Sequence, residues 1–324
     1  MTGNEVRKLF LDYFAEKEHR ILRSSGLVPL NDPTLLFTNA GMVQFKNVFT
    51  GLETRDYVRA VTSQKCVRAG GKHNDLDAVG KSLRHLSFFE MMGNFSFGDY
   101  FKHKAIRWAW DFITDVLEVD QSKIWITVHI SDDEAEKIWH EEIGVPMERI
   151  QRLDKDNFWE MGETGPCGPS TEIFYDFGPE WGPDGGPANP DAEERFIEVW
   201  NVVFMESFRD SKGELTPLPN QHVDTGAGLE RLVGMLRGSP SLYACDTLDE
   251  LVQEGAKVSG RPFGNNDKDN QALRVIADHV RSATFLISDG IIPSNEGRGY
   301  VLRRIIRRAV RFAYLLGIKQ EIMP

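Results

Sequence analysis

Cysteine is scarce in this chain of 324 residues, and the spacing of the few cysteines excludes two classes of protein. Cys66, Cys167 and Cys245 stand far apart, are odd in number and form no C-x-x-C pair. A secreted domain held by disulfides usually has an even number of cysteines, and a Cys-rich structural zinc site needs closely spaced ones. We therefore expect a reduced protein, of the kind found in the cytoplasm, without a structural zinc ion.

Long apolar runs and the signatures of several enzyme classes are missing as well. No apolar run reaches the roughly 18 residues that a membrane-spanning helix needs, so no membrane partner is expected. Residues 1–5 contain neither the basic nor the apolar part of a secretory signal. H-E-x-x-H and G-x-S-x-G motifs do not occur, and the eight histidines show no metal spacing. The residues thus give no support to a hydrolase or a metalloenzyme.

The composition that remains is that of an ordinary globular protein. Hydrophobic residues make up 41 % of the chain and charged residues 27 %. The length suits one large or two ordinary domains. Disorder and fibrous repeats are therefore not expected.

Charge is distributed very unevenly along the chain. Residues 297–319 contain no Asp or Glu but seven cations, so that a net charge of −11 for the whole chain leaves −18 for the rest. The cations are Arg298, Arg303, Arg304, Arg307, Arg308, Arg311 and Lys319. Such asymmetry indicates an acidic body with one element that faces a polyanion.

Hydrophobic periodicity predicts an α+β body over residues 1–240 and a helical domain over residues 241–324. A capping box, Thr2-x-x-Glu5, predicts the first helix. Strands 58–67 and 87–92, joined by a polar loop, predict an antiparallel hairpin. The other predicted strands are 34–38, 123–128, 196–205 and one ending at 222–225. The other predicted helices are 104–117, 132–143, one from Gly226 to about residue 237, 246–258, 270–287 and 301–316.

The hairpin loop at residues 68–75 is the first candidate site. Gly70 and Gly71 allow backbone N–H groups to approach an anion, while Arg68 and Lys72 supply positive charge. The loop is not a P-loop, because G-x-x-x-x-G-K-[ST] is absent. A solvated hairpin tip is the alternative interpretation.

Two further glycine-containing stretches are candidates. In residues 224–231 an acid, Asp224, precedes a Gly-rich helix start, and Arg231 follows one turn later. That order suits an ammonium group at the acid and a phosphate at the arginine, although a helix cap with a packing glycine is the alternative. Residues 162–172 are too irregular for an ordinary turn, and Trp159 before them could wall a small pocket or simply pack in the core.

The predicted helix 301–316 is a further candidate, for binding a polyanion. Its apolar stripe consists of Leu302, Ile305, Ile306, Ala309, Val310 and Ala313, and the arginines lie on the opposite face. Five arginines within nine residues and no interleaved acid suit phosphates better than water. A helix on a membrane surface is the competing interpretation.

Taken together, these stretches resemble the catalytic part of the alanyl-tRNA synthetases, a family of class II aminoacyl-tRNA synthetases. The resemblance covers nearly the whole chain, with long motifs in the family's order. They are residues 32–42, 65–75, 88–101, 162–172, 200–201, 224–232 and 298–304. The resemblance implies a six- or seven-stranded antiparallel sheet flanked by helices, followed by a helical tRNA-recognition domain.

The resemblance also implies an activity and roles for individual residues. Alanine and ATP would give alanyl-adenylate and pyrophosphate, and alanine would then pass to the 3′ end of tRNA(Ala). Arg68 and Arg231 are the implied catalytic residues. The implied ATP site contains Arg68, Phe88, Phe89, Trp159, Val199, Trp200, Asn201, Gly228 and Arg231. The implied alanine site contains Trp159, Asn201, Val223, Asp224 and Gly226. The implied contacts to the tRNA acceptor stem are Asn295, Arg298, Arg303, Arg304, Arg307, Arg308 and Arg311.

The family implies Mg²⁺ bound with ATP, mainly through the phosphates, and no metal held by protein side chains alone. Lys72 and Asp75 are further implied members of the loop site. Where the family often has two histidines this chain has His85-Leu86, so no contact from a second histidine is expected. Relatives continue into editing and C-terminal domains that this fragment lacks. Class II enzymes are commonly dimers, and for a catalytic fragment a monomer is the alternative oligomeric state.

Two other functions are compatible with the same residues. One is a non-catalytic RNA-binding paralogue that kept the scaffold, although Arg68, Asn201, Asp224 and Arg231 together argue against a degenerate site. The other is a ligase that charges a carrier protein instead of tRNA. The Arg-rich helix favours RNA over a protein acceptor.

Overall fold

A mixed β-sheet forms the centre of the computed structural model, which describes residues 1–29, 32, 35–71, 74–160 and 164–320. Within these residues the sheet has nine strands in the order β1-β2-β3-β9-β8-β7-β4-β5, and β6 pairs with β7 beside this path. The strands are β1 (Arg20–Ile21), β2 (Arg59–Val67), β3 (Phe88–Phe97), β4 (Ile124–His129), β5 (Ile150–Leu153), β6 (Phe158–Glu160), β7 (Gly165–Asp176), β8 (Phe196–Arg209) and β9 (Leu215–Gly228).

The six strands from β2 to β4 along this path pair antiparallel, as the class II resemblance implies. Parallel pairing occurs at both edges, where β1 joins β2 and β5 joins β4. The sheet is therefore mixed and larger than expected. The two edge strands have only two and four residues, which gives them little periodicity to detect in the sequence.

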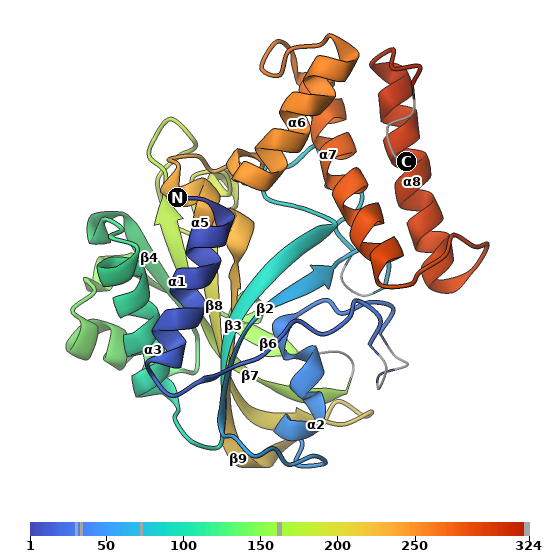
Figure 1. Ribbon diagram of the computed structural model, residues 1–324. Coiled ribbons are helices and arrows are strands. Elements are labelled where there is room, and N and C mark those ends of the chain that lie inside the picture. Colours follow the sequence, from blue (N-terminus) through green and yellow to red (C-terminus); the bar gives the residue numbers. More distant parts are fainter. Residues whose placement is uncertain (30–31, 33–34, 72–73, 161–163, 321–324) are drawn as a thin grey trace.

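Helices cover the sheet and extend beyond it (Figure 1). Their bounds are α1 (Gly3–Ala15), α2 (Lys46–Phe49), α3 (Lys102–Asp111), α4 (Asp133–Lys137), α5 (Leu229–Leu236), α6 (Asp246–Ser259), α7 (Asp267–Ser288) and α8 (Gly297–Leu315). Wider π-helical turns continue α3 over Phe112–Val116 and α4 over Ile138–Ile143. In Figure 1, α6, α7 and α8 stand together beyond one end of the sheet. After β9 the described chain has helices and no strand, as predicted; the domain boundary at residue 240 stays a prediction.

The first helix shows how local sequence fixes an element and its packing. The Thr2 side chain accepts from the backbone N–H of Glu5, and the Glu5 carboxylate accepts from the backbone N–H of Thr2 at 2.8 Å. This confirms the predicted capping box. Phe10 and Phe14 on the buried face of α1 then contact Trp200 of β8, with ring centroids 5.4 and 6.2 Å apart.

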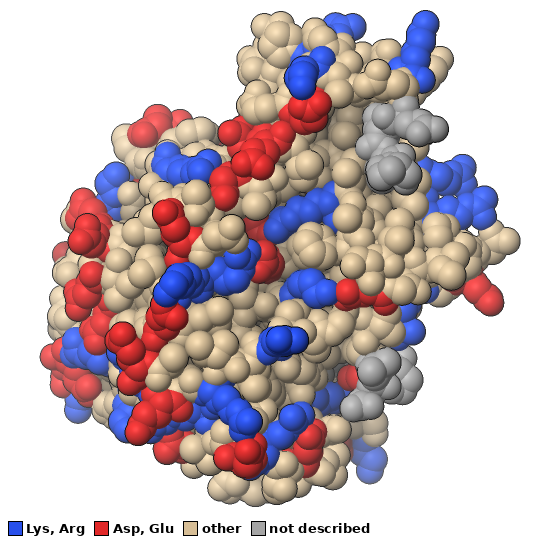
Figure 2. Space-filling model, in the orientation of Figure 1, with Lys and Arg blue, Asp and Glu red and all other residues tan. Residues whose placement is uncertain are grey.

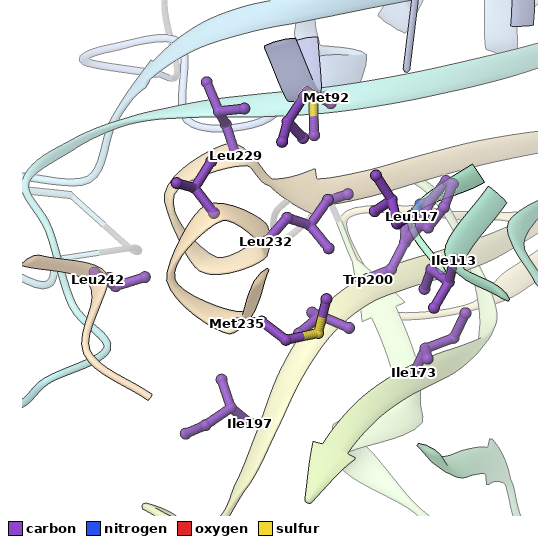
Figure 3. Packing of buried hydrophobic residues seen from close by; sticks show 14 of the residues in the cluster. Met92, Ile113, Leu117, Ile173, Ile197, Trp200, Leu229, Leu232, Met235 and Leu242 are labelled. Carbon is purple, nitrogen blue, oxygen red and sulfur yellow. The ribbon is translucent and has the colours of Figure 1, made fainter. Parts of the chain in front are cut away.

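The short helix α5 is placed by the same core. Leu229, Leu232 and Met235 lie on its buried face and belong to one hydrophobic cluster with Met92 of β3 and Trp200 of β8 (Figure 3). Every one of these side chains is at most 5 % exposed. Burial of this kind stabilises a helix that is too short to be stable alone. It also fixes the start of α5 against the ends of β3 and β9.

Three element predictions were wrong. Leu35–Thr38 forms no strand: the Thr38 N–H bonds to the Leu27 carbonyl, and Val67 bonds to Thr38, outside any ladder. Residues 165–172, for which no strand was predicted, belong to the long strand β7. Gly226–Gly228 continues β9, so the helix begins at Leu229 and not at Gly226.

No helix among the described residues is long and apolar enough to cross a membrane.

Candidate active site

A cavity of about 260 Å³ lies between β3, β7, β8, β9, α5 and the loop after β2. Eight of the residues predicted for the ATP and alanine sites line it. They are Arg68, Phe89, Trp159, Asn201, Asp224, Gly226, Gly228 and Arg231. These residues span more than 160 positions of the sequence, and the antiparallel sheet brings them to one place.

Strand register explains why the central residues share one face. Asn201 of β8 stands opposite Gly226 of β9, and Val203 stands opposite Asp224. On the other side of β8, Glu172 of β7 is the partner of Asn201. Since side chains alternate between the two faces of a sheet, these five residues point to the same side.

Asp224 is the most unusual group in the cavity. It is 6 % exposed, and within the described part of the chain its carboxylate has neither a hydrogen bond nor an ion pair. Burial raises the pKa of this carboxyl well above its ordinary value. A buried carboxylate without a partner is unfavourable, so the site suits a ligand that brings a positive charge.

Asn201 adds a second acceptor to this part of the cavity. Its Nδ2 donates to Oε1 of Glu172 at 2.8 Å, whereas its Oδ1 is buried and has no hydrogen-bond partner among the described residues. Burial raises the pKa of the Glu172 carboxyl well above its ordinary value, and the neighbouring charge of Glu198 raises it further. Asp224 and Asn201 thus both have unused acceptor capacity.

Two guanidinium groups supply positive charge to the same cavity. Arg231 on α5 donates to the Glu198 carboxylate at 2.7 Å and to the backbone oxygen of Glu198 at 2.9 Å. Arg68, from the loop after β2, donates to the Asn39 carbonyl at 3.2 Å and lies 5.1 Å from the ring centre of Phe89. The cavity therefore combines the carboxyl group of Asp224, two guanidinium groups and the aromatic ring of Phe89.

The loop after β2 holds its shape through backbone bonds and two glycines. Asp75 donates its N–H to the carbonyl of Arg68 at 3.0 Å, which closes the loop, and Asp75 also lines the cavity. Gly70 and Gly71 have φ angles of +79° and +80°, which side chains rarely allow. Lys72 lies outside the described residues.

Met91 forms part of the cavity wall through close contacts on two sides. Its sulfur accepts the N–H of Gly41 at 3.2 Å. A Cβ placed on Gly226 would come within 2.9 Å of the same sulfur. A side chain at position 226 would therefore force the Met91 side chain to shift.

Four predicted site residues do not line the cavity. Phe88 lies on the other face of β3, where its ring stacks on Phe285 of α7 at 4.3 Å, so that of the two phenylalanines only Phe89 lines the cavity. Val199, Trp200 and Val223 are buried in the main hydrophobic core. Alternation along the strands turns the side chains of Trp200 and Val223 away from the cavity. Val199 is two residues from Asn201 and is turned away by the register shift between β7 and β8, where it has no partner residue on β7. A role for the backbone groups of these residues stays a prediction.

The arginines of α8 fall into two groups. Arg303, Arg304, Arg307 and Arg311 are exposed, and Figure 2 shows positive side chains without negative ones along the outer edge over α8. Arg298 and Arg308 are half-buried and bind inward. Arg298 donates to the carbonyls of Leu35 and Leu36, and Arg308 donates to those of Leu76 and Val79.

The exposed face of α8 also differs from the predicted stripe. Val310 is 51 % exposed and does not join the buried residues Leu302, Ile305, Ala309 and Ala313. Tyr300 and Tyr314 lie exposed among the arginines, at 52 % and 79 %. Arg304 is 3.2 Å from Asp77, and Arg303 contacts Asn295, the remaining predicted RNA contact. This face combines cations with apolar and aromatic surface.

Comparison with known proteins decides the family. The model of the "tRNA synthetases class II (A)" family matches residues 5–324. The chain belongs to the class II (A) tRNA synthetases. The resemblance inferred from the motifs is thereby confirmed.

Two curated relatives of this class II synthetase chain carry the name "Alanine--tRNA ligase". The one from Chromohalobacter salexigens is 56 % identical over 321 residues, and the alignment covers 99 % of this chain and 36 % of the relative. The one from Legionella pneumophila is 58 % identical over 320 residues, with 98 % and 37 % covered. The chain thus spans little more than a third of the length of these relatives.

A solved structure of apo histidyl-tRNA synthetase from S. aureus is also similar to this class II synthetase chain. It is 8 % identical with a TM-score of 0.44, and the match covers 79 % of this chain and 75 % of that one.

Sequence reasoning missed several residues that line the cavity of this class II synthetase. They are Ala40, Arg84, Leu86, Met91, Glu172, Glu198, Val203, Glu230 and Leu242. Val203 could have been found, because it is two residues from Asn201 on a predicted strand. Glu172 and Glu198 carried no such signal, since single carboxylates on strands are common and only the register brings these two together.

Proposed function

We propose that the chain activates alanine with ATP, forming alanyl-adenylate and pyrophosphate, and then transfers alanine to the 3′ end of tRNA(Ala). The observation that carries the proposal is the buried carboxylate of Asp224, which has no partner among the described residues and shares a cavity with Arg68 and Arg231. The names of the relatives, at 56 % and 58 % identity over nearly the whole chain, support alanine as the amino acid.

The ammonium group of alanine fits between Asp224 and Asn201. The carboxylate of Asp224 supplies the opposite charge, and Oδ1 of Asn201 supplies a further acceptor. Trp159, Val203 and Gly226 line the same region. A pocket of this kind discriminates weakly between side chains that differ by one small group, typically by about 1–3 kcal/mol. We therefore expect detectable activation of serine and glycine.

Activation requires no general base in this chain. The alanine carboxylate is already ionised, and one of its oxygens forms the new bond to the α-phosphorus while the bond to pyrophosphate breaks. Arg68 stabilises the negative charge that develops on the phosphate, and Arg231 holds the phosphates from α5. Phe89 stacks on the adenine ring. Catalysis is then mostly orientation and charge stabilisation.

Magnesium is expected with ATP, as is general for class II synthetases. No group of three or more His, Cys, Asp or Glu side chains in the described chain is arranged to hold a metal ion. Glu172 and Glu198 nevertheless both line the cavity, and two carboxylates together with phosphate oxygens suit Mg²⁺. When bound, the cation would offset charge on the phosphates of ATP.

The exposed face of α8 is the proposed contact for the tRNA acceptor stem. Arg303, Arg304, Arg307 and Arg311 are exposed and can reach phosphates. Asp77 lies beside Arg304, and Asn295 lies beside Arg303. Arg298 and Arg308, in contrast, hold α8 to the body of the chain. A location in the cytoplasm, where protein synthesis takes place, is part of this proposal.

The proposal is tested by ATP–pyrophosphate exchange with alanine, serine, glycine and leucine. We expect the strongest exchange with alanine, weaker exchange with serine and glycine, and none with leucine. A folded chain that binds tRNA(Ala) without any amino-acid-dependent exchange would refute the proposal and identify a non-catalytic RNA-binding paralogue.

A further inference from the structure

Glu172 is a buried carboxyl group whose contact with Asn201 is not explained by its place near the proposed Mg²⁺. It is 8 % exposed, and its backbone is paired on both sides, with Thr127 of β4 and with Asn201 of β8. Glu198 places a second negative charge nearby, with Arg231 as the nearby opposing charge and Asp156 as a more distant acid. An apolar side chain would fill this place at lower cost, so the carboxyl needs an explanation.

The explanation begins with an ambiguity of the asparagine side chain. A carboxamide has a donor end and an acceptor end of nearly the same shape, and a half-turn exchanges them. Only the acceptor end can bind an ammonium group. An asparagine in an ammonium site therefore needs a neighbour that fixes which end the ligand meets.

Glu172 is that neighbour for Asn201. Its Oε1 accepts from Nδ2 of Asn201 at 2.8 Å, which leaves Oδ1 as the acceptor without a partner. The reversed carboxamide would place its own oxygen against the oxygen of Glu172, and two acceptors repel each other. When Glu172 is ionised, its charge behind the amide also makes Oδ1 a stronger acceptor.

We infer that Glu172 is a positioning residue for recognition of the amino acid: it holds the carboxamide of Asn201 so that Oδ1 meets the ammonium group beside Asp224. This inference rests on the proposed function. The rival role for Glu172 is direct ligation of the Mg²⁺ that accompanies ATP, together with Glu198. The two roles act on different substrates, and kinetics separate them.

The first variant is Glu172→Gln, which keeps the shape of the side chain. Its amide can pair with either end of Asn201, so the carboxamide loses its preferred orientation. An acceptor that is presented half of the time costs about twofold in affinity, and loss of the charge behind the amide adds to this. We expect the KM for alanine in pyrophosphate exchange to rise about fivefold. The KM for ATP and the Mg²⁺ dependence should stay within about twofold of the wild-type values.

The decisive variant exchanges the two groups, as Glu172→Gln together with Asn201→Asp. An aspartate at position 201 accepts from the introduced glutamine amide at position 172 through one oxygen and from the ammonium through the other, so its orientation no longer matters. We expect the exchanged pair to recover most of the KM for alanine that Glu172→Gln loses. Asn201→Asp alone should raise this KM, because it sets two carboxylates against each other.

Glu198→Gln is the matched control. It makes the same chemical change at the neighbouring carboxylate, which contacts Arg231, so we expect it to raise the KM for ATP rather than that for alanine. Thermal unfolding of every variant checks the fold. Should Glu172→Gln fail to fold, Glu172→Asp serves instead. Its side chain is one methylene shorter, so the acceptor no longer reaches Asn201, and the KM for alanine should again rise without a change in the KM for ATP.

Three results would overturn the inference while leaving the proposed function in place. They are an unchanged KM for alanine in Glu172→Gln, an equal change in ATP or Mg²⁺ dependence, and no recovery in the exchanged pair. A wild-type chain that neither activates alanine nor binds it in calorimetry overturns the proposed function, and the inference falls with it.

Discussion

The cavity and the outer face of α8 use the same kinds of charged side chain under opposite physical conditions. In the cavity the charges are few, buried and held by the sheet, as with Asp224 at 6 % exposure. On α8 the arginines are numerous and exposed, the helix itself contains no acidic residue, and Figure 2 shows a positive surface there. Burial strengthens each electrostatic interaction, whereas water and salt weaken exposed ones. Substitution of one charged residue in the cavity should therefore change activity more than substitution of several arginines on α8 changes RNA binding.

Arg308 makes the comparison sharper, because it stands on α8 but behaves like a cavity residue. Its guanidinium donates to the Val79 carbonyl at 3.1 Å and lies 3.0 Å from Nε2 of His279. His279 is in turn 2.7 Å from Asp278, which accepts from the backbone N–H of Ser87 at 2.8 Å. Its position on α8 therefore does not decide whether an arginine is available to bind a ligand or stabilises the fold.

The largest effect is expected for Arg68→Ala. Loss of a guanidinium that stabilises developing charge typically lowers the rate by about 10²–10³-fold. Among the described residues, the Arg68 side chain makes one hydrogen bond, to the Asn39 carbonyl, so the fold should persist without it. Pyrophosphate exchange with alanine measures the first effect, and circular dichroism checks the second. Retention of more than a tenth of the wild-type rate would contradict the assignment.

The second prediction sets function against stability at Asp224. Asp224→Asn should lower alanine-dependent exchange by about 10²-fold or more, because it removes the charge that pairs with the ammonium. The same change should raise the free energy of unfolding at neutral pH by about 0.5–2 kcal/mol, as is common when a strained active-site group is replaced. Urea unfolding measures it. A destabilised variant would show that the carboxylate has an internal partner.

The pH dependence of that stability difference follows from the raised pKa of Asp224. A raised folded-state pKa contributes stability below the unfolded value of 3.8, and this contribution is lost as the pH rises through the folded value. The advantage of Asp224→Asn should therefore be large at pH 8 and vanish near the unfolded pKa.

Alanine binding should show the opposite trend with pH. Only the ionised carboxylate pairs with the ammonium group, so the KM for alanine should rise about tenfold for each pH unit below the folded-state pKa of Asp224. Exchange kinetics between pH 5 and 8, with the KM for ATP as the internal reference, measure this. A KM for alanine that is flat over the range would mean that Asp224 does not bind the ammonium.

The smallest effect is expected on α8. Arg307→Ala with Arg311→Ala should weaken binding of a tRNA(Ala) acceptor-stem helix and reduce the slope of log affinity against log salt by about 2, one for each phosphate contact. The unfolding free energy should change by less than about 0.5 kcal/mol. The matched control is Arg308→Ala, which should destabilise the chain by about 1–3 kcal/mol, since it leaves buried carbonyls unpaired. An unchanged salt slope in the double variant would move the RNA contact away from this face.

Most elements could be predicted from the sequence because their patterns are local. The capping box at Thr2, the hairpin of β2 and β3 and the helices after Gly228 all follow from spacing that neighbouring residues contain. Motif resemblance supplied the eight predicted residues that line the cavity. Register could not be predicted, and register decides that Glu172 meets Asn201 and that Phe88 and Phe89 face opposite ways.

The failures have a common physical cause in contacts that come from distant parts of the chain. Gly168 lies in β7, where no strand was predicted, and a Cβ there would lie 1.9 Å from the backbone oxygen of Phe204. The glycine serves close strand approach at a shift in register, not chain reversal. In the same way a helical wheel cannot show that Arg308 meets the carbonyls of Leu76 and Val79.

The contacts of Met91 restrict the order in which this cavity wall can change during evolution. A methyl group at position 226 would collide with the Met91 sulfur, and moving that sulfur would break its bond to the N–H of Gly41. A first substitution at Gly226 therefore requires the Met91 side chain to move, whereas the same substitution would not meet this sulfur once position 91 has changed. Positions on β3 and β9 and the backbone at Gly41 are thus coupled in evolution, so that the order in which mutations occur matters as much as their identity.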